Sequence, residues 1–146
     1  MIRISTRGRY ALRAMIDVAL HDDEGPVPRQ DIAKRQAISG DYIAQLFRRL
    51  GAAGLVEGVK GPGGGYRLTS DASTISAGDV VRAVEGPIAV VHCVEPNEEP
   101  SCNRVDRCVT QLLWKQLSEA MTEYLGSVTL KDLCDEERQL YQEKEE

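Results

Sequence analysis

Residues 55–69, Leu-Val-Glu-Gly-Val-Lys-Gly-Pro-Gly-Gly-Gly-Tyr-Arg-Leu-Thr, form the stretch that decides the fold. Segments 55–59 and 66–69 hold β-branched and aromatic residues typical of short strands, and four glycines and one proline lie between them. Two such runs separated by a glycine-rich tip predict a β-hairpin. A phosphate-binding nucleotide loop is disfavoured, because the Lys-Ser/Thr pair of a P-loop and the spacing of a dinucleotide fingerprint are both missing.

Two helices are predicted directly before this hairpin. Pro28 suits a first helical position, so a short helix is expected from about residue 28 to 36. Residues 39–41 open the next helix, whose apolar stripe consists of Ile43, Leu46, Phe47 and Leu50. The two helices and their tight connection form a helix-turn-helix, and the hairpin makes it a winged one.

Helical patterns also lie on both sides of this unit. One is expected from Ser5 to about Leu20 and another from 76 to 85, whereas the prolines and acids of 88–103 predict a loop. The longest pattern runs from about 104 to 127 and has an apolar seam with steps of three and four residues: Trp114, Leu117, Met121, Tyr124 and Val128. A last helix is expected at about 129–142.

The seam of the long helix has two interpretations, ordinary core packing or contact with a second copy of the chain. Because the winged domain already has its own core, we predict homodimerisation, with Trp114, Leu117, Met121 and Tyr124 at the interface. The predicted fold class is therefore mainly α with a small β-wing: a winged helix-turn-helix DNA-binding domain at 1–86, a cysteine-bearing sensor loop at 87–103, and a dimerisation helix with a C-terminal helix at 104–146.

Length and charge agree with this organisation. A chain of 146 residues suits one domain with an interaction arm. Residues 1–70 hold 11 Lys and Arg against 7 Asp and Glu, whereas residues 71–146 hold 7 against 16. A basic front half predicts an anionic partner there, although a solvated face of mixed charge is a common alternative.

DNA recognition is predicted for the second helix of the helix-turn-helix and for the wing. The candidate DNA-facing residues are Ser39, Asp41, Tyr42, Gln45, Arg48, Arg49 and Lys60. Those from 39 to 45 lie at the helix end that meets base edges, and Gln45 can make a bidentate pair with adenine. The two arginines suit phosphates, and the glycine tip with Lys60 suits close approach to a narrow groove. Each residue alone is commonly a solvated surface group, so only the combination carries the hypothesis.

Four cysteines lie in the second half: Cys93, Cys102, Cys108 and Cys134. Eight residues separate the first two and five separate the second from the third, a spacing that suits an iron-sulfur cluster better than a zinc ribbon. Zinc, redox-active thiols and buried bystanders stay open as alternatives. Cys134, on an apolar helix, is predicted to be a packed residue.

Several of these motifs resemble one known superfamily. The motifs are Thr-Arg-Gly-Arg-Tyr-Ala-Leu-Arg-Ala-Met at 6–15, Gly-Pro-Val-Pro at 25–28, Asp-Tyr-Ile-Ala-Gln-Leu-Phe at 41–47, Gly-Leu-Val at 54–56, Gly-Pro-Gly-Gly-Gly-Tyr at 61–66, and the three-cysteine loop followed by Leu-Trp at 113–114. Over about residues 1–135 the chain resembles the IscR, NsrR and CymR superfamily of bacterial winged-helix regulators, and the IscR branch most. The resemblance implies a homodimer on a palindromic operator in double-stranded DNA, and a [2Fe-2S] cluster whose state changes which operators are bound.

The resemblance also implies roles for particular residues. Cys93, Cys102 and Cys108 match the cluster cysteines, and Tyr42, Gln45 and Lys60 fall on DNA-facing positions.

Three features depart from the IscR pattern. The first gap between cysteines is longer than expected, Gln111 stands at the position of a histidine ligand, and Ala44 stands at that of a glutamate that discriminates between operators. The fourth ligand is therefore unknown, with His92, Cys134, Asp106 or a group of the partner subunit as candidates.

The sequence also indicates what the protein is not. No run approaches the roughly 20 apolar residues of a membrane helix, and arginines occupy the N-terminal region, so we expect a cytoplasmic protein without a membrane partner. With no Cys-x-x-Cys and no cofactor fingerprint, neither enzymatic activity nor a small-molecule substrate is expected. Two alternatives to a cluster-sensing regulator are a cluster-free redox-thiol regulator of the CymR type and an iron-sulfur or metal-binding protein without operator binding.

Overall fold

The computed structural model describes residues 1–96 and 102–145. Its helices are α1 (Thr6–His21), α2 (Arg29–Gln36), α3 (Gly40–Ala52), α4 (Ala77–Glu85), α5 (Val109–Ser127) and α6 (Leu130–Glu145), and its strands are β1 (Val56–Val59) and β2 (Gly65–Leu68). Short 3-10 turns lie at η1 (Asp22–Glu24), η2 (Ala72–Thr74), η3 (His92–Val94) and η4 (Val105–Arg107). The predicted fold class, mainly helical with a two-stranded wing, is confirmed. Within the described ranges no helix is long and apolar enough to cross a membrane.

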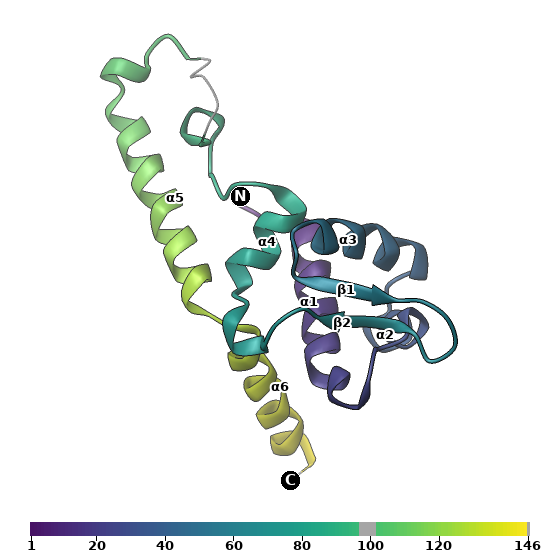
Figure 1. The fold of residues 1–146 in the computed structure, drawn as a ribbon. Coiled ribbons are helices and arrows are strands. Elements are labelled where there is room, and N and C mark those ends of the chain that lie inside the picture. The colour runs from purple at the N-terminus through teal and green to yellow at the C-terminus, as the bar shows by residue number, and fades with distance from the viewer. Residues whose placement is uncertain (97–101, 146) are drawn as a thin grey trace.

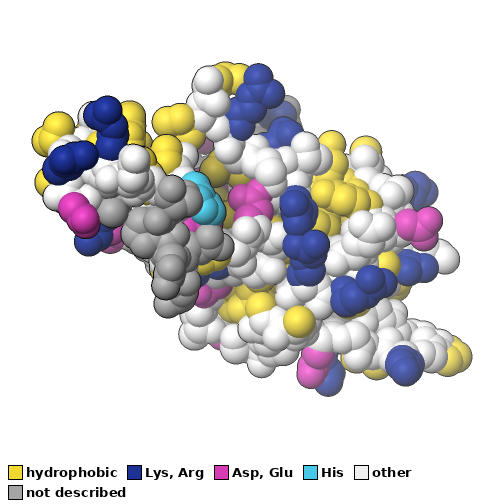
Figure 2. Space-filling model, turned by 90° about the horizontal axis from the view of Figure 1, so that it is seen from above, with side chains coloured by type: hydrophobic (Ala, Val, Ile, Leu, Met, Phe, Trp, Pro, Cys, Tyr) yellow, Lys and Arg dark blue, Asp and Glu magenta, His cyan; other side chains and the backbone are white. Residues whose placement is uncertain are grey.

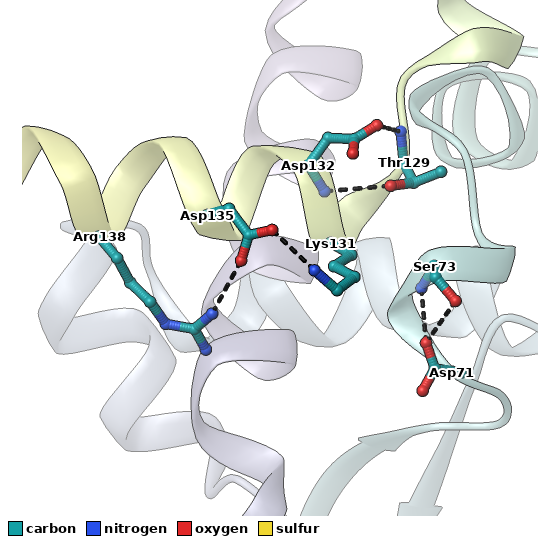
Figure 3. Close-up of polar contacts among 7 residues, drawn as sticks. All are labelled: Asp71, Ser73, Thr129, Lys131, Asp132, Asp135 and Arg138. Carbon is teal, nitrogen blue, oxygen red and sulfur yellow. Dashed lines mark hydrogen bonds and ion pairs between the residues drawn. The ribbon is translucent and has the colours of Figure 1, made fainter.

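Polar side chains fix where several helices begin. The hydroxyl of Ser39 accepts a hydrogen bond from the Tyr42 backbone amide at 3.2 Å, which satisfies one of the free amides at the start of α3. Ser76 and Asp79 form a reciprocal capping box at α4. Thr129 and Asp132 exchange the same pair of bonds, each 3.0 Å, at the start of α6 (Figure 3).

The wing is an antiparallel pair in which Val56 lies opposite Leu68 and Val59 opposite Gly65. The segment between α1 and α2 is bonded to the returning strand β2. Val27 of that segment and Tyr66 of β2 exchange two backbone hydrogen bonds of 2.8 Å. Gly65 permits this contact: its φ is +152°, and a Cβ there would lie 2.2 Å from the Val27 carbonyl oxygen. The hairpin predicted from the glycine-rich tip is therefore present and anchored to the helical part.

One hydrophobic core joins α1 to α4, the wing and the start of α6. Its fully buried side chains include Met15, Ile32, Ile43, Leu46, Leu50, Ile75, Val80, Val84 and Leu130. Phe47 of α3 stacks on Tyr66 of β2 with ring centroids 4.3 Å apart, so the helix and the wing are positioned together. Asp17 of α1, only 1% exposed, accepts hydrogen bonds from both Arg35 and Gln36 of α2, which fixes the first two helices to each other.

Helix α5 stands away from this core, and α6 continues beyond the base of α5 and packs against α1 (Figure 1). The long helix was predicted from about residue 104, but α5 begins at Val109 because Cys108 adopts an extended conformation after the short turn η4. The turn between α5 and α6 is bonded to the segment before α4: the Ala77 amide donates to Val128 and the Leu130 amide to Ile75, at 2.8 and 2.9 Å. The base of α5 is thereby attached to the winged domain.

Candidate nucleic-acid interface and cysteine loop

The outer face of α3 carries most of the predicted DNA-facing residues. Its inner face is buried in the core, whereas Asp41, Gln45, Arg48 and Arg49 are exposed and Tyr42 is half-buried. Gln45 and Arg48 bond to no other side chain in the described part of the protein, so their polar ends are available to a ligand. Ser39 is exposed, but its hydroxyl serves as the cap of the helix.

Helix α1 supports this face, which the sequence had not indicated. The ring of Tyr10 meets that of Tyr42 edge to face at 6.0 Å, and the Arg13 guanidinium lies 5.2 Å from the centre of the Tyr10 ring. Arg13 also donates to the backbone carbonyl of Gln36 at the end of α2. These contacts hold the Tyr42 ring at the start of α3 and place a cation beside it.

Arg48 and Arg49 differ in their surroundings. Nη1 of Arg49 donates to the Val84 carbonyl at 3.0 Å and so links α3 to α4. Arg48 makes no such bond within the described ranges. Of the two, Arg48 is therefore better suited to a phosphate contact, while part of the Arg49 guanidinium serves the fold.

The charged residues of the wing differ in whether they form an ion pair. On the strands, Arg67 pairs with Glu57 at 2.6 Å, which neutralises that face. Lys60, before the glycine tip, is exposed and has no carboxylate within 4.0 Å among the described residues. It lines a groove of about 710 Å³ together with Arg29 and Gln30 at the start of α2. Seen from above, Lys and Arg side chains spread over the winged-domain side with few Asp and Glu among them (Figure 2).

The three loop cysteines have different environments. Cys93 is half-buried in η3, Cys102 is exposed, and Cys108 is half-buried directly before α5. Cys93 and Gln111 line one cleft of about 640 Å³, and Gln111 also lines a smaller cleft with Cys108 and Asp106. Gln111, where the resemblance implies a ligand, therefore shares one cleft with Cys93 and another with Cys108.

The type of donor atom on the cysteine loop favours an iron-sulfur cluster, whereas the positions of the described side chains do not. Three thiols on one loop are the ligand type that iron-sulfur clusters use. Within residues 1–96 and 102–145, however, no three Cys, His, Asp or Glu side chains lie close enough together to hold a metal ion. The described arrangement therefore does not itself fit the cluster.

Hydrogen bonds lower the pKa of the Cys108 thiol below its usual range. The Thr110 hydroxyl, 3.0 Å from Sγ, is the largest cause, followed by the Gln111 backbone amide, and both lower the pKa of the Cys108 thiol. A thiol held in this way at a helix start favours the thiolate, which is the form that binds metals and reacts with oxidants.

The candidates for a fourth ligand are separated by the fold. His92 lies in η3 with Nδ1 at 3.4 Å from Glu95 Oε2. Cys134 is 3% exposed, packs against α1, and its burial raises the pKa of the thiol to about 11. It lies on α6, which joins α5 at the end away from the cysteine loop (Figure 1). The prediction that Cys134 is a packed residue is confirmed by its burial.

The residues of the predicted apolar seam on α5 face in two different directions. Tyr124 is 69% exposed, and Trp114 and Leu117 are half-buried. Met121 instead lines a cleft with Val81 of α4 and the N-terminal residues, so it faces its own chain. Three exposed apolar residues at the start of this helix were not predicted as part of the seam: Val109, Leu112 and Leu113.

Comparisons with known proteins agree with this arrangement. Residues 4–136 match the Rrf2 family, described as iron-dependent transcriptional regulators. The chain is 48% identical over 132 residues to the HTH-type transcriptional regulator IscR of Xenorhabdus nematophila, covering 90% of this chain and 79% of that protein. Its fold is similar to that of CymR, the global cysteine regulator of B. subtilis, with a TM-score of 0.74 and 41% identity over 92% of this chain and 98% of that chain. It is also similar to that of IscR from T. potens, with a TM-score of 0.74 and 35% identity over 92% of this chain and 87% of that chain. The chain therefore belongs to the Rrf2 family of DNA-binding transcriptional regulators.

Proposed function

We propose that this protein is a homodimeric regulator that binds a palindromic operator in double-stranded DNA and senses iron-sulfur cluster status, or oxidative or nitrosative stress, through its cysteine loop. In this assignment residues 1–86 bind DNA, 87–103 form the sensor loop, and 104–146 form the dimer. It is a cytoplasmic protein without enzymatic activity. The observation that carries the DNA-binding role is the exposed polar face of α3, whose opposite face is fixed to the wing through Phe47 and Tyr66.

Dimerisation is proposed from the unpartnered apolar face of α5. Val109, Leu113 and Tyr124 are 76%, 53% and 69% exposed, and their spacing places them along one side of the helix. Exposed apolar surface on one helix face favours association, because its burial releases about 25 cal/mol per Å². A two-fold dimer presents two copies of α3 to half-sites about one helical turn apart, which requires a palindromic operator.

The proposed cofactor is a [2Fe-2S] cluster held by Cys93, Cys102 and Cys108, with the fourth ligand unknown. The three-thiol donor set and the 48% identity to the IscR of Xenorhabdus nematophila support this choice. A bound cluster would hold these three thiols closer together than they lie within the described ranges. When bound, the cluster supplies an iron centre that oxidants and nitric oxide attack.

A redox-thiol regulator without a cluster is the second candidate. Two observations favour it: the separated loop thiols and the 41% identity with CymR. In that case Cys108, whose thiol pKa is lowered by Thr110, is a thiol suited to reaction with an oxidant.

One experiment distinguishes the two candidates. Protein purified without oxygen is analysed for visible absorption, iron and sulfide, beside the variants C93A, C102A, C108A and, as a matched control, C134A. A cluster predicts colour that the first three variants each lose and the buried control keeps. Colourless protein, even after anaerobic reconstitution, would favour the redox-thiol regulator. Colour lost in C134A would identify Cys134 as the fourth ligand.

Operator binding needs its own test. The full-length protein is titrated with duplex DNA at several salt concentrations. A specific DNA-binding protein is expected to bind operator more tightly than random duplex, with the logarithm of its affinity falling linearly with the logarithm of salt concentration. A protein without such binding would contradict the regulatory role and favour a metal-binding function.

A further inference from the structure

The groove between the wing and the start of α2 has walls that are fixed by backbone contacts. Val27 and Tyr66 exchange two backbone hydrogen bonds of 2.8 Å directly before α2. Gly64 and Gly65 approach neighbouring carbonyls so closely that an added Cβ would lie 2.1 and 2.2 Å from them. The glycine tip therefore curves past α2 at a set distance (Figure 1), and the groove of about 710 Å³ is part of the fold itself.

The lining of this groove has only one sign of charge. Arg29 and Lys60 are its charged residues, Gln30 adds an amide, and the remainder is glycine, proline and the side chains of Val59 and Tyr66. Across residues 1–96 and 102–145, neither cation has a carboxylate within 4.0 Å. Three other arginines of the winged domain are neutralised: Arg35 pairs with Asp17, Arg67 with Glu57 and Arg82 with Asp79. Two unpaired cations in a concave surface without carboxylates favour an anion.

Arg29 lies close to α3 as well as to the wing groove. A Cβ on Gly40, the first residue of α3, would lie 3.8 Å from Arg29 Nε. Arg29 therefore lies between the wing groove and the end of α3 that meets base edges. In a winged helix the reading helix enters the major groove and the wing tip approaches a neighbouring groove, so a phosphodiester strand passes between them.

We infer that Arg29 is a DNA-backbone contact, which together with Lys60 holds one phosphodiester strand in the groove between α2 and the wing. The inference rests on the proposed binding of operator DNA and adds a residue that neither the helix-turn-helix pattern nor the wing motif indicates. Its role is electrostatic, because phosphate contacts position the protein without reading the bases.

The test is a salt series of operator and random-duplex binding with the full-length protein and R29Q. Each lost phosphate contact lowers the slope of log affinity against log salt by about 0.9, so a dimer with two grooves should lose about 2. Operator and random duplex should weaken by the same factor. R29K keeps the charge and should keep the slope.

K34Q is the matched control, because Lys34 is an exposed cation of the same helix that does not line the groove. Its salt slope should equal that of the unmodified protein. An unchanged slope in R29Q, or an equal loss in K34Q, would overturn the inference while leaving DNA binding in place. If the unmodified protein binds no duplex, the proposed function itself fails. Arg29 is exposed, so an unchanged thermal midpoint is expected to confirm that R29Q folds.

Discussion

Gln45 and Arg48 lie one turn apart on the exposed face of α3, yet their chemistry predicts different effects on binding. The Gln45 amide can donate and accept at one adenine edge, whereas the Arg48 guanidinium is a cation suited to any phosphate. Base recognition and general affinity for DNA are therefore expected to depend on different side chains of this helix.

Gln45→Ala should lose discrimination at one base pair, at a cost of about 1 to 3 kcal/mol, because a bidentate contact is removed. Arg48→Ala should weaken all duplexes alike. Competition binding against a panel of single-base operator variants measures both effects. An equal, sequence-independent loss in the two variants would show that Gln45 reads no base.

Cys134 allows a prediction about pH and thiol reactivity. Burial raises the pKa of its thiol from 9.0 to about 11, so the folded state favours the neutral thiol. The resulting stabilisation is fully present below pH 9 and is lost between about pH 9 and 11, as the unfolded chain ionises first. Across that range the free energy of unfolding should fall in the unmodified protein relative to Cys134→Ala, as measured by urea titration.

The same burial predicts how a thiol reagent will react with metal-free native protein. The exposed or half-buried Cys93, Cys102 and Cys108 should be alkylated quickly, and Cys134 only after unfolding. Peptide mass spectrometry after timed alkylation identifies each site. Fast labelling of Cys134 in the native protein would mean that α6 detaches from α1.

At the scale of elements, α5 differs most from the rest of the protein. Ser118 is its only buried residue within the described ranges, whereas each helix of the winged domain buries an apolar side. A helix of this length gains little stability alone, since most helical stability in proteins comes from tertiary packing. In the proposed homodimer, a second copy of α5 covers this apolar face.

Leu113→Glu combined with Tyr124→Glu should therefore give monomers, because both charges would enter a desolvated interface. Sedimentation velocity measures the mass in solution. Lys115→Glu is the matched control: it changes the net charge by the same amount, but its side chain lines the cleft beside the cysteine loop. A persistent dimer in the double variant, or a monomer in the control, would place the interface elsewhere.

At the scale of the whole molecule, a continuous set of contacts connects the cysteine loop with the DNA-binding face. Cys108 precedes α5, and the far end of α5 is bonded through Val128 and Leu130 to the segment that opens α4. Helix α4 in turn accepts the hydrogen bond of Arg49 from α3. A change at the loop can therefore alter the position of α3 through α5 and then through α4, which shares a core with α3.

Coupling of this kind is reciprocal. If the cluster changes operator affinity by some factor, operator DNA should change the affinity for the cluster by the same factor. The apo variant C108A and the cluster-containing protein should thus bind at least one operator with different affinity, as measured by fluorescence anisotropy without oxygen. Equal affinities for every operator tested would separate the cluster from regulation.

Local signals in the sequence were sufficient for the elements of the winged domain. The glycines of 61–65 predict a hairpin because few residues tolerate positive φ, and Gly61, Gly63 and Gly65 adopt it. Ser39 and the apolar spacing of 43–50 predict the start and the buried face of α3, since a cap and a 3.6-residue period are properties of one segment. The burial of Cys134 followed from the same reasoning.

Tertiary structure decided which distant side chains meet. Periodicity gives the angle of Met121 on its helix, but only the packing of α5 against α4 turns it toward its own chain. Likewise, no local pattern places Arg29 beside Gly40, or Gln111 in one cleft with Cys93. The physical reason is that helix and turn signals depend on neighbours within a few residues, whereas grooves and ligand sites depend on how whole elements pack, and that packing is determined by the core as a unit.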